Sequence, residues 1–213
     1  DSGGSHGGGG GGATTTDFVG ILSSDDGLES GSLAVTVSTA TPAPPAPTSV
    51  SFVIVTASGT FTLVGGTPVT LTGSYDDATG ALTITGGGYS FTGVYDGSNR
   101  LEGTYTGPTT AGTFVSAQSD GTTEAFCGSY AGDDQGLWNF VIDGNTLLGE
   151  AVSVNSGTSA PLDGSINANA ISILFPGTQQ VLATGTRNGS AVSGTWDDPN
   201  STDQGTWTGA ACQ

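Results

Sequence analysis

Acidic side chains are the residues of this sequence whose type and spacing could support chemistry. Adjacent aspartates occur four times, each where a strand is expected to end: Asp25–Asp26, Asp76–Asp77, Asp133–Asp134 and Asp197–Asp198. Calcium binds carboxylate and carbonyl oxygens on flexible loops. Glycosidases use two carboxyl groups that flank the bond they cleave. The aspartate pairs therefore raise two possibilities, a metal site and a hydrolytic site.

A calcium site is expected, if anywhere, in the segment DDPNSTDQG (197–205). Its candidate ligands are Asp197, Asp198, Asn200 and Asp203. The segment does not match the EF-hand pattern, which requires a glycine and a glutamate at fixed positions. The alternative is a structural role, because aspartate favours turns by hydrogen bonding to nearby backbone. A divalent cation is the only cofactor or ion partner that the sequence suggests.

Catalysis is not expected. The acidic residues fall in polar turns, and nothing in the sequence indicates the aromatic groove and shielded acid that a glycosidase generally needs. The single histidine, His6, lies in a glycine-rich segment. A Ser–His–Asp mechanism needs a rigidly oriented base, so His6 is interpreted as an ordinary tail residue. We predict a protein that is not an enzyme.

The charge balance excludes several partners. The chain has no lysine, two arginines (Arg100 and Arg187) and 19 acidic residues, for a net charge of −17. Nucleic acids and anionic membrane surfaces are therefore unfavourable partners, because both are bound mainly through basic side chains. No stretch approaches the ~18 apolar residues of a membrane-spanning helix.

The cysteines and the first residue suggest export. The sequence begins with Asp1 and contains no methionine. It is interpreted as a mature protein whose signal peptide was removed, and an extracellular or cell-surface location is expected. Cys127 and Cys212 are the only cysteines, and they predict one disulfide formed in an oxidising compartment. Two free buried thiols are the alternative.

An internal duplication organises the chain. The segment DFVGILSSDD (17–26) returns as AFCGSYAGDD (125–134), and later segments correspond in the same order. This pattern predicts two homologous β units, at 17–119 and 120–213, after a glycine-rich tail at 1–16. The first unit is longer because of a proline-rich insertion, TATPAPPAPTS (39–49).

The expected fold class is all-β. Glycine, serine, threonine and valine are poor or mediocre helix formers, and short runs with a period of two recur about every ten residues, such as Leu33, Val35 and Val37. Turn segments such as DGN (143–145) and NG (188–189) predict tight hairpins between antiparallel neighbours. Each unit is therefore predicted to be a meander forming a small closed barrel or a sandwich. The cysteines lie in the first and last strands of the second unit, so their bond would fasten a barrel seam.

The pattern of residues on single strand faces suggests a full interior. Val192, Gly194 and Trp196 share a face, as do Leu101, Gly103 and Tyr105. Small residues beside large ones fill narrow barrels, which argues against a roomy ligand cavity. The run SVSFVIVTA (49–57) is apolar on both faces, so it is a candidate for a contact between units or subunits.

The leading functional hypothesis is a non-catalytic, exported structural subunit. A glycine run has no side chains and can lie along a sheet edge, so the tail is expected to dock on the next copy by β-augmentation. Contacts repeated head to tail give a filament or surface layer, which makes a homo-oligomer or polymer. The candidate assembly residues are Gly7, Gly8, Gly9, Gly10, Gly11, Gly12, Pro42, Pro44, Pro45 and Pro47.

A binding module is the rival hypothesis. A closed antiparallel barrel can hold a glycan or small ligand in its mouth, where aromatic side chains would contact it. The residues to inspect are Trp138, Trp196, Trp207, Tyr105 and Tyr130. Packing of these side chains in the barrel interiors is the structural alternative. A third possibility is a surface lipoprotein domain in which the glycine tail is only a tether.

Overall fold

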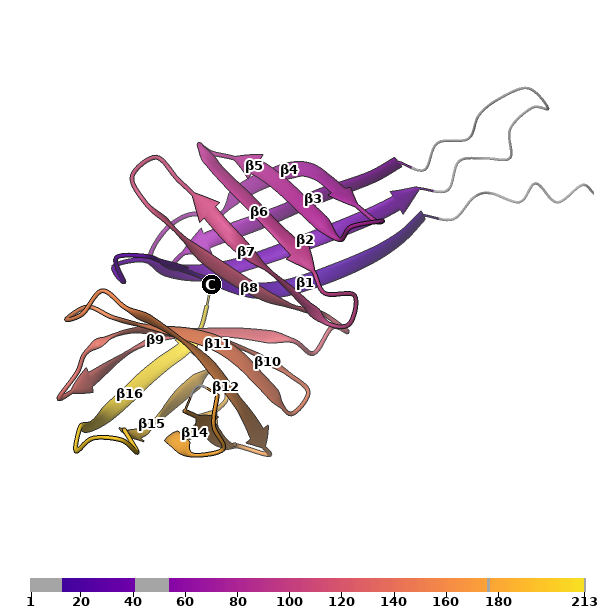
Figure 1. The fold of residues 1–213 in the computed structure, drawn as a ribbon. Coiled ribbons are helices and arrows are strands. Elements are labelled where there is room, and N and C mark those ends of the chain that lie inside the picture. Colours follow the sequence, from indigo (N-terminus) through magenta and orange to yellow (C-terminus); the bar gives the residue numbers. More distant parts are fainter. Residues whose placement is uncertain (1–12, 41–53, 176, 213) are drawn as a thin grey trace, which may run out of the picture.

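The two halves of the chain form separate β-barrels that stack on each other (Figure 1). The computed structural model describes residues 13–40, 54–175 and 177–212, and their regular secondary structure is entirely β-strand. Within those residues no helix is long and apolar enough to cross a bilayer. The predicted all-β fold with two antiparallel units in tandem is confirmed, and both units are closed barrels rather than sandwiches.

Barrel 1 is an up-and-down barrel in which each strand pairs with its neighbours in sequence and β1 closes on β8. Its strands are β1 (Ala13–Ser24), β2 (Ser30–Ala40), β3 (Ile54–Leu63), β4 (Val69–Asp76), β5 (Ala81–Gly86), β6 (Tyr89–Tyr95), β7 (Arg100–Thr106) and β8 (Ala111–Gln118).

Barrel 2 repeats this topology, with β9 closing on β16. Its strands are β9 (Glu124–Gly132), β10 (Gly136–Asp143), β11 (Thr146–Ser153), β12 (Ser159–Asn167), β13 (Ala170–Leu174), β14 (Val181–Asn188), β15 (Ala191–Asp197) and β16 (Gln204–Ala211). The sequence of this unit contains eight strand-like runs, and the structure has the same number of strands.

Barrel 1 differs from the expectation at two places. The runs SVSFVIVTA (49–57) and TFTLV (60–64) suggest two strands, but the structure has one continuous strand, β3, in which Gly59 pairs with Val35 and with Leu71. β1 begins at Ala13, four residues before the expected start of the unit, and pairs with β2 from there. The glycine run 7–12 and residues 41–53, which include the four candidate assembly prolines, lie outside the described residues.

Two-residue hairpins make the meander possible. The pair Asp143–Thr146 closes the turn between β10 and β11, and the pair Asn188–Ala191 closes the turn between β14 and β15. Gly144 and Gly189, at the first central positions, have φ of 57° and 61°. That left-handed region is available to glycine at little cost and matches the twist of adjacent strands.

The disulfide lies at the seam of barrel 2, as predicted. Cys127 and Cys212 are bonded, with Cα atoms 5.3 Å apart. Cys127 pairs with Ala210 across the ladder between β9 and β16, and the Cys212 amide donates to the Ala125 carbonyl at 2.9 Å. A disulfide within one chain is compatible with an extracellular location.

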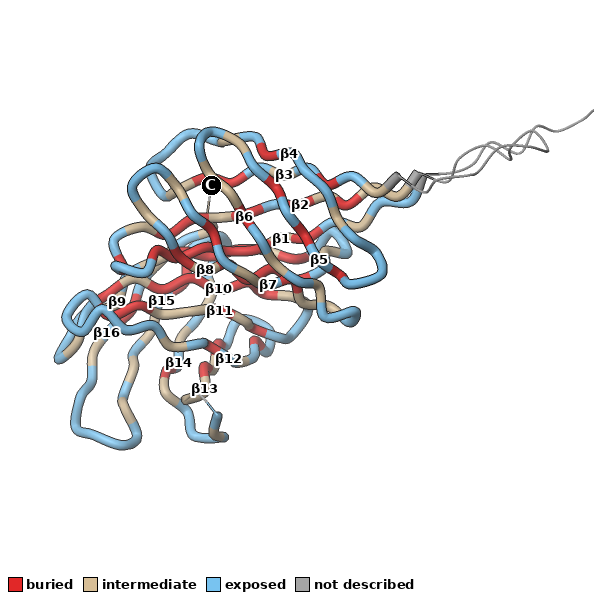
Figure 2. The backbone as a smooth tube through the Cα atoms, turned by 45° about the horizontal axis from the view of Figure 1, so that its top comes forward, coloured by how far each residue is buried: buried red, intermediate tan, exposed pale blue. Residues whose placement is uncertain are grey.

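The outer faces of four strands hold the barrels together. A cluster of buried side chains lies between β1 and β8 of one barrel and β9 and β10 of the other: Ile21, Val115, Ala117, Ala125 and Val141. The buried stretches of β1, β8 and β10 meet in the middle of the molecule in Figure 2. This contact fixes the two barrels through apolar burial.

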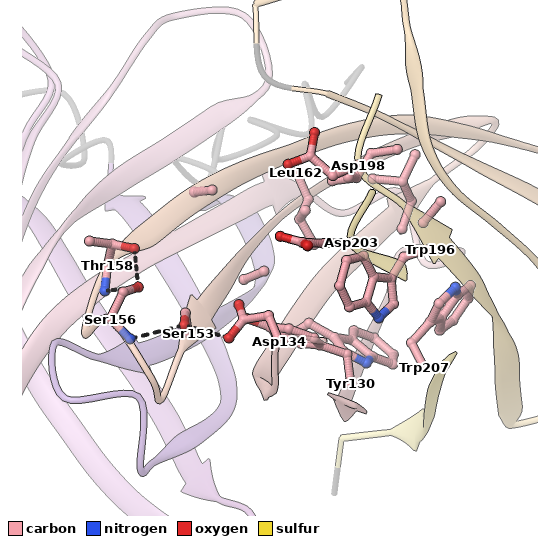
Figure 3. Close-up of a pocket in the computed structure, with 16 residues that line it drawn as sticks. Tyr130, Asp134, Ser153, Ser156, Thr158, Leu162, Trp196, Asp198, Asp203 and Trp207 are labelled. Atoms are coloured by element: carbon pink, nitrogen blue, oxygen red, sulfur yellow. Dashed lines mark hydrogen bonds between the residues drawn. The ribbon is translucent and has the colours of Figure 1, made fainter. Parts of the chain in front are cut away.

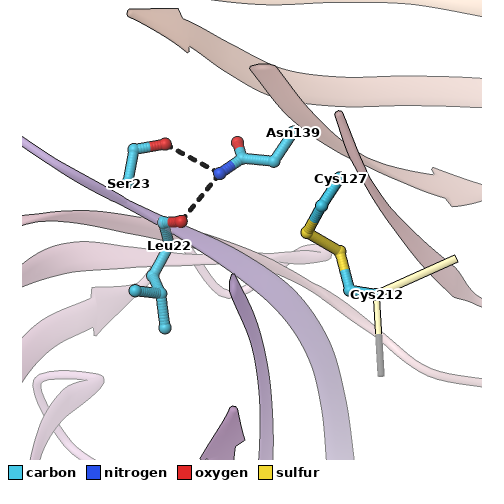
Figure 4. The surroundings of a disulfide bond; sticks show 5 residues. All are labelled: Leu22, Ser23, Cys127, Asn139 and Cys212. Atoms are coloured by element: carbon cyan, nitrogen blue, oxygen red, sulfur yellow. Dashed lines mark hydrogen bonds between the residues drawn. A yellow bond between two sulfur atoms is a disulfide. The ribbon is translucent and has the colours of Figure 1, made fainter. Parts of the chain in front are cut away.

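One buried amide adds specificity to the contact. The Asn139 side chain is fully buried, and its Nδ2 donates to the Leu22 carbonyl and the Ser23 hydroxyl of barrel 1, each at 2.7 Å. It lies near the disulfide (Figure 4). The run 49–57 does not supply this contact in its described part, because Val55 and Ala57 pack in the core of barrel 1.

Candidate ligand site at the mouth of barrel 2

A cavity of about 280 Å³ lies at one end of barrel 2 (Figure 3). In an up-and-down barrel alternate hairpins lie at the same end, so the β9–β10, β11–β12 and β15–β16 connections meet there. The residues that line the cavity come from these three connections, from the strands that they join, and from β13 and β14. They are Tyr130, Asp134, Trp138, Ala151, Ser153, Ser156, Thr158, Ala160, Leu162, Ile173, Leu182, Ala183, Trp196, Asp198, Asp203 and Trp207.

Glycines on neighbouring strands make room for the indole rings in the barrel. A Cβ on Gly185 or Gly194 would collide with the Trp207 ring, and a Cβ on Gly128 or Gly209 would collide with the Trp138 ring. These large and small residues do share the interior face, as the sequence predicts. The indoles nevertheless leave a cavity above them, and its size is modest.

The floor of the cavity is aromatic and buried, whereas its rim is open to solvent. Trp138 and Trp207 are each 4% exposed, and their rings meet edge to face with centroids 5.3 Å apart. Tyr130 and Trp196 are half-buried nearer the rim and meet at 87°, with centroids 6.0 Å apart. The Trp138–Trp207 pair forms the base of the cavity and the Tyr130–Trp196 pair forms part of its wall. Rings arranged in this way can surround a small molecule on several sides.

Backbone carbonyls fix all three indoles. The Nε1 of Trp138 donates to the Ser129 carbonyl at 3.1 Å, and the Nε1 of Trp196 donates to the Ala131 carbonyl at 3.3 Å. The Nε1 of Trp207 donates to the carbonyls of Thr184 and Thr195, at 3.2 and 3.3 Å. The aromatic surface is therefore preorganised, and the indole donors are already used.

Asp134 links the aromatic wall to the β11–β12 connection. Its carboxylate accepts hydrogen bonds from the Tyr130 hydroxyl at 3.0 Å, from Ser153 Oγ at 3.0 Å and from Asn155 Nδ2 at 2.9 Å. Burial raises the pKa of the Tyr130 phenol well above its usual value, and the hydrogen bond to Asp134 and the charge of that carboxylate raise it further. Tyr130 therefore remains a neutral donor over the physiological range.

The candidate calcium ligands separate in the structure. Asp198 and Asp203 line the cavity, while Asp197 and Asn200 are exposed and do not. Asp198 Oδ1 accepts from the Asn200 amide at 2.8 Å, which is the turn-forming role that the sequence offered as the alternative. In the described part of the chain no group of three or more His, Cys, Asp or Glu side chains is placed to hold a metal ion. The geometry gives the calcium prediction no support.

Four of the five aromatic residues named from the sequence line the cavity. The fifth, Tyr105, lies in the core of barrel 1, where it is buried against Phe91. Sequence reasoning did not place Asp134, Ser153, Leu162 and Ile173 at the site. In a meander, every second hairpin lies at the same end of the barrel. Asp134 in the β9–β10 connection and Ser153 at the end of β11 therefore lie at the same end as the β15–β16 connection next to Trp196, and this rule could have indicated them.

Comparisons with protein-family models, curated proteins and solved structures found no match to this chain. Its function is therefore argued from the geometry of the cavity and from the charge around it.

Proposed function

We propose that barrel 2 is a non-catalytic binding module that holds a small ligand in its mouth. The observation that carries this proposal is the aromatic cavity, whose buried floor and half-exposed rim match the usual form of small-molecule sites. A volume of about 280 Å³ lies just below the ~300–1,000 Å³ of pockets for drug-sized ligands, so the ligand is small. Extracellular or cell-surface placement, predicted from the sequence, remains part of the proposal.

The polar groups support binding rather than catalysis. Asp134 accepts three hydrogen bonds that tie Tyr130, Ser153 and Asn155 together. A carboxylate used in this way orders the loops of the site. Preorganised walls of this kind reduce the entropy that a ligand must otherwise lose on binding.

Tryptophan fluorescence tests the proposal directly, because all three tryptophans of the chain line this cavity. We expect titration with at least one class from a panel of neutral sugars, polyols, amines and carboxylates to give a saturable fluorescence change. The same compound should raise the melting temperature, because a ligand that binds the folded state stabilises it. No saturable change with any class would overturn the proposal.

A pair of matched variants places the binding in barrel 2. Trp196→Leu removes a half-exposed wall of the cavity and should weaken binding about tenfold or more, which corresponds to ~1.4 kcal/mol. Tyr75→Leu changes a half-exposed aromatic residue of barrel 1 and should leave the affinity unchanged. Equal losses in the two variants would argue against the assigned site.

A structural subunit remains a second proposal, favoured by one observation. Residues 13–16 of β1 pair with β2 on one side, while β8 reaches β1 only from Phe18 onward. β1, β2 and β3 project beyond the rest of barrel 1 (Figure 1). Among the described residues no strand pairs with the other side of 13–16, and an unpaired strand edge can accept a strand from another copy.

Deletion of residues 1–12 tests this second proposal. Electron microscopy of the full chain should show fibres or layers, and the deleted chain should show separate particles with the same circular dichroism spectrum. Separate particles in both samples, or undiminished assembly of the deleted chain, would reject the role of the tail.

A further inference from the structure

We propose that the ligand of barrel 2 is a small organic cation with an alkylated ammonium group. This inference rests on the proposed function and specifies the chemistry of the ligand. Three properties of the cavity carry it: the sign of its charge, its shortage of hydrogen-bond donors, and the arrangement of its aromatic rings.

The charge of the lining is negative. Among the described residues, three carboxylates line the cavity, from Asp134, Asp198 and Asp203, and no basic side chain does. The two arginines are engaged elsewhere: Arg100 pairs with Glu102 at 2.7 Å and Arg187 pairs with Glu124 at 2.6 Å. An anionic ligand would therefore find no counter-charge at the site, whereas a cation would be favoured there and steered to it by the charge of the whole chain.

The side chains of the lining offer few hydrogen-bond donors. Each indole N–H is bonded to a backbone carbonyl, and Tyr130 and Ser153 donate to Asp134. The hydroxyls of Ser156 and Thr158 bond to each other at 2.6 Å, which leaves one free hydrogen between them. A sugar needs donors for its oxygens as well as acceptors for its hydroxyls. An ammonium group needs only acceptors and negative charge.

The aromatic rings form a box rather than a flat platform. Trp138 and Trp207 meet at 87°, as do Tyr130 and Trp196. Rings at right angles contact a compact, rounded group on several sides, and a tryptophan face attracts a cation. The aliphatic side chains of Leu162, Ile173 and Leu182 complete the lining and suit the alkyl groups of such a cation. In Figure 3 the acidic side chains of Asp134 and Asp203 lie beside this aromatic group.

Choline and its uncharged isostere 3,3-dimethylbutan-1-ol test the inference, since they share one shape and differ in charge. We expect choline to bind, by calorimetry and by tryptophan fluorescence, at least about tenfold more tightly than the isostere, because cation–π attraction reaches ~2 kcal/mol in a desolvated site. Glycine betaine has the same head group with an added carboxylate, and it should bind more weakly than choline.

Charge variants make the test specific to the cavity. Asp203→Asn should weaken choline binding about threefold or more and leave the isostere unaffected, because only the charged ligand interacts with the carboxylate. Asp163→Asn is the matched control, since Asp163 is exposed on β12 and does not line the cavity. The control should bind choline as the original chain does, and added salt should weaken choline binding only.

The outcomes separate this inference from the proposed function. Preferential binding of choline supports both. Binding of the isostere or of methyl glycosides as tight as that of choline overturns the cationic ligand but retains the binding module. A complete lack of choline binding, with a saturable response to another class of compound, has the same meaning. A lack of response to every class overturns both.

Discussion

Tyr130 shows how a single side chain joins the wall of the cavity to its polar rim. Its ring contacts Trp196 edge to face, while its hydroxyl donates to Asp134. Both the burial of the ring and the carboxylate favour the neutral phenol, and they raise its pKa in the folded state. The hydroxyl proton of Tyr130 therefore links the Tyr130–Trp196 ring pair to Asp134 in the β9–β10 connection.

This coupling predicts a loss of stability at alkaline pH. An unfolded tyrosine has a pKa of about 10, so the stabilising contribution of the neutral phenol is fully present below that pH. It is lost as the pH rises from about 10 through the higher pKa of the folded state. The free energy of unfolding in urea should fall between about pH 8 and about pH 11, and it should fall less in the Tyr130→Phe variant.

Ultraviolet titration supplies the independent check. Burial also raises the pKa of Tyr105 and of Tyr75, so three of the five tyrosines should ionise later than the rest in the folded chain. Tyr130→Phe should remove one of these late groups. Ionisation of all five tyrosines together near pH ~10, without unfolding, would contradict the described environment.

At the level of single residues, the sequence indicated which aromatic side chains to consider but not that they meet at one cavity. Trp138, Trp196, Trp207 and Tyr130 could be named as candidates because large aromatic residues stood out in a chain rich in glycine and serine. Tyr105 had the same alternating context as Trp196, yet it fills barrel 1. Whether an interior aromatic residue closes a barrel or leaves a cavity depends on the volume of its neighbours, which a single strand does not reveal.

The two barrels differ in how their first and last strands are joined. β9 and β16 are linked by the disulfide, whereas β1 and β8 are joined by hydrogen bonding and packing, with Val19 opposite Ala117 near the corresponding place. The sequence predicted the fastened seam of barrel 2, although a period of two and short hairpins are consistent with either a closed barrel or a sandwich. It also placed the cysteines in the first and last strands of their unit.

Loss of the disulfide should destabilise barrel 2 selectively. The cysteines are separated by 85 residues in sequence, and a loop of that size corresponds to about 4.6 kcal/mol in the chain-entropy model. We expect Cys127→Ala with Cys212→Ala to lower the urea midpoint reported by tryptophan fluorescence, which monitors barrel 2 only. An unchanged midpoint, with the same slope, would show that the seam holds equally well without the bond.

The strands at the contact between barrels were not identified from the sequence. LWNFVID (137–143) and FVGILSS (18–24) carry apolar residues on both faces, which was an available signal. From the sequence, SVSFVIVTA (49–57) is the candidate for this contact, because that run is also apolar on both faces. In β10, Phe140 and Ile142 face the interior of barrel 2, while Val141 faces barrel 1. A two-faced strand indicates a second contact but does not identify its partner.

At the scale of the whole molecule, the contact between the two stacked barrels combines apolar burial with several polar contacts. Asn139 donates across the middle, and Asn99 Nδ2 donates to Asp143 Oδ2 at 2.7 Å. Thr113 donates to Glu150 nearby. Such contacts between distant parts of the chain follow from the relative placement of complete barrels, which no local pattern specifies.

Asn139→Ala should weaken this coupling. Removing a buried donor costs about 1–3 kcal/mol, so the free energy of unfolding of barrel 2 should fall by that amount in a urea titration followed by tryptophan fluorescence. Asn167→Ala, at the exposed end of β12, should change it by less than about 0.5 kcal/mol. Equal effects of the two substitutions would mean that the buried amide does not stabilise the contact.

The unequal interiors of the two copies have an evolutionary consequence. In barrel 1 the rings of Phe61, Phe91, Tyr105 and Phe114 occupy the centre, while in barrel 2 a cavity remains at one end of the barrel. After a duplication, barrel 1, whose interior is filled by aromatic rings, can keep the protein stable while the residues around the cavity of barrel 2 change. If barrel 2 binds a ligand as proposed, changes in the connections around residues 153–160 and 198–203 would alter which ligand it binds and leave the scaffold unchanged.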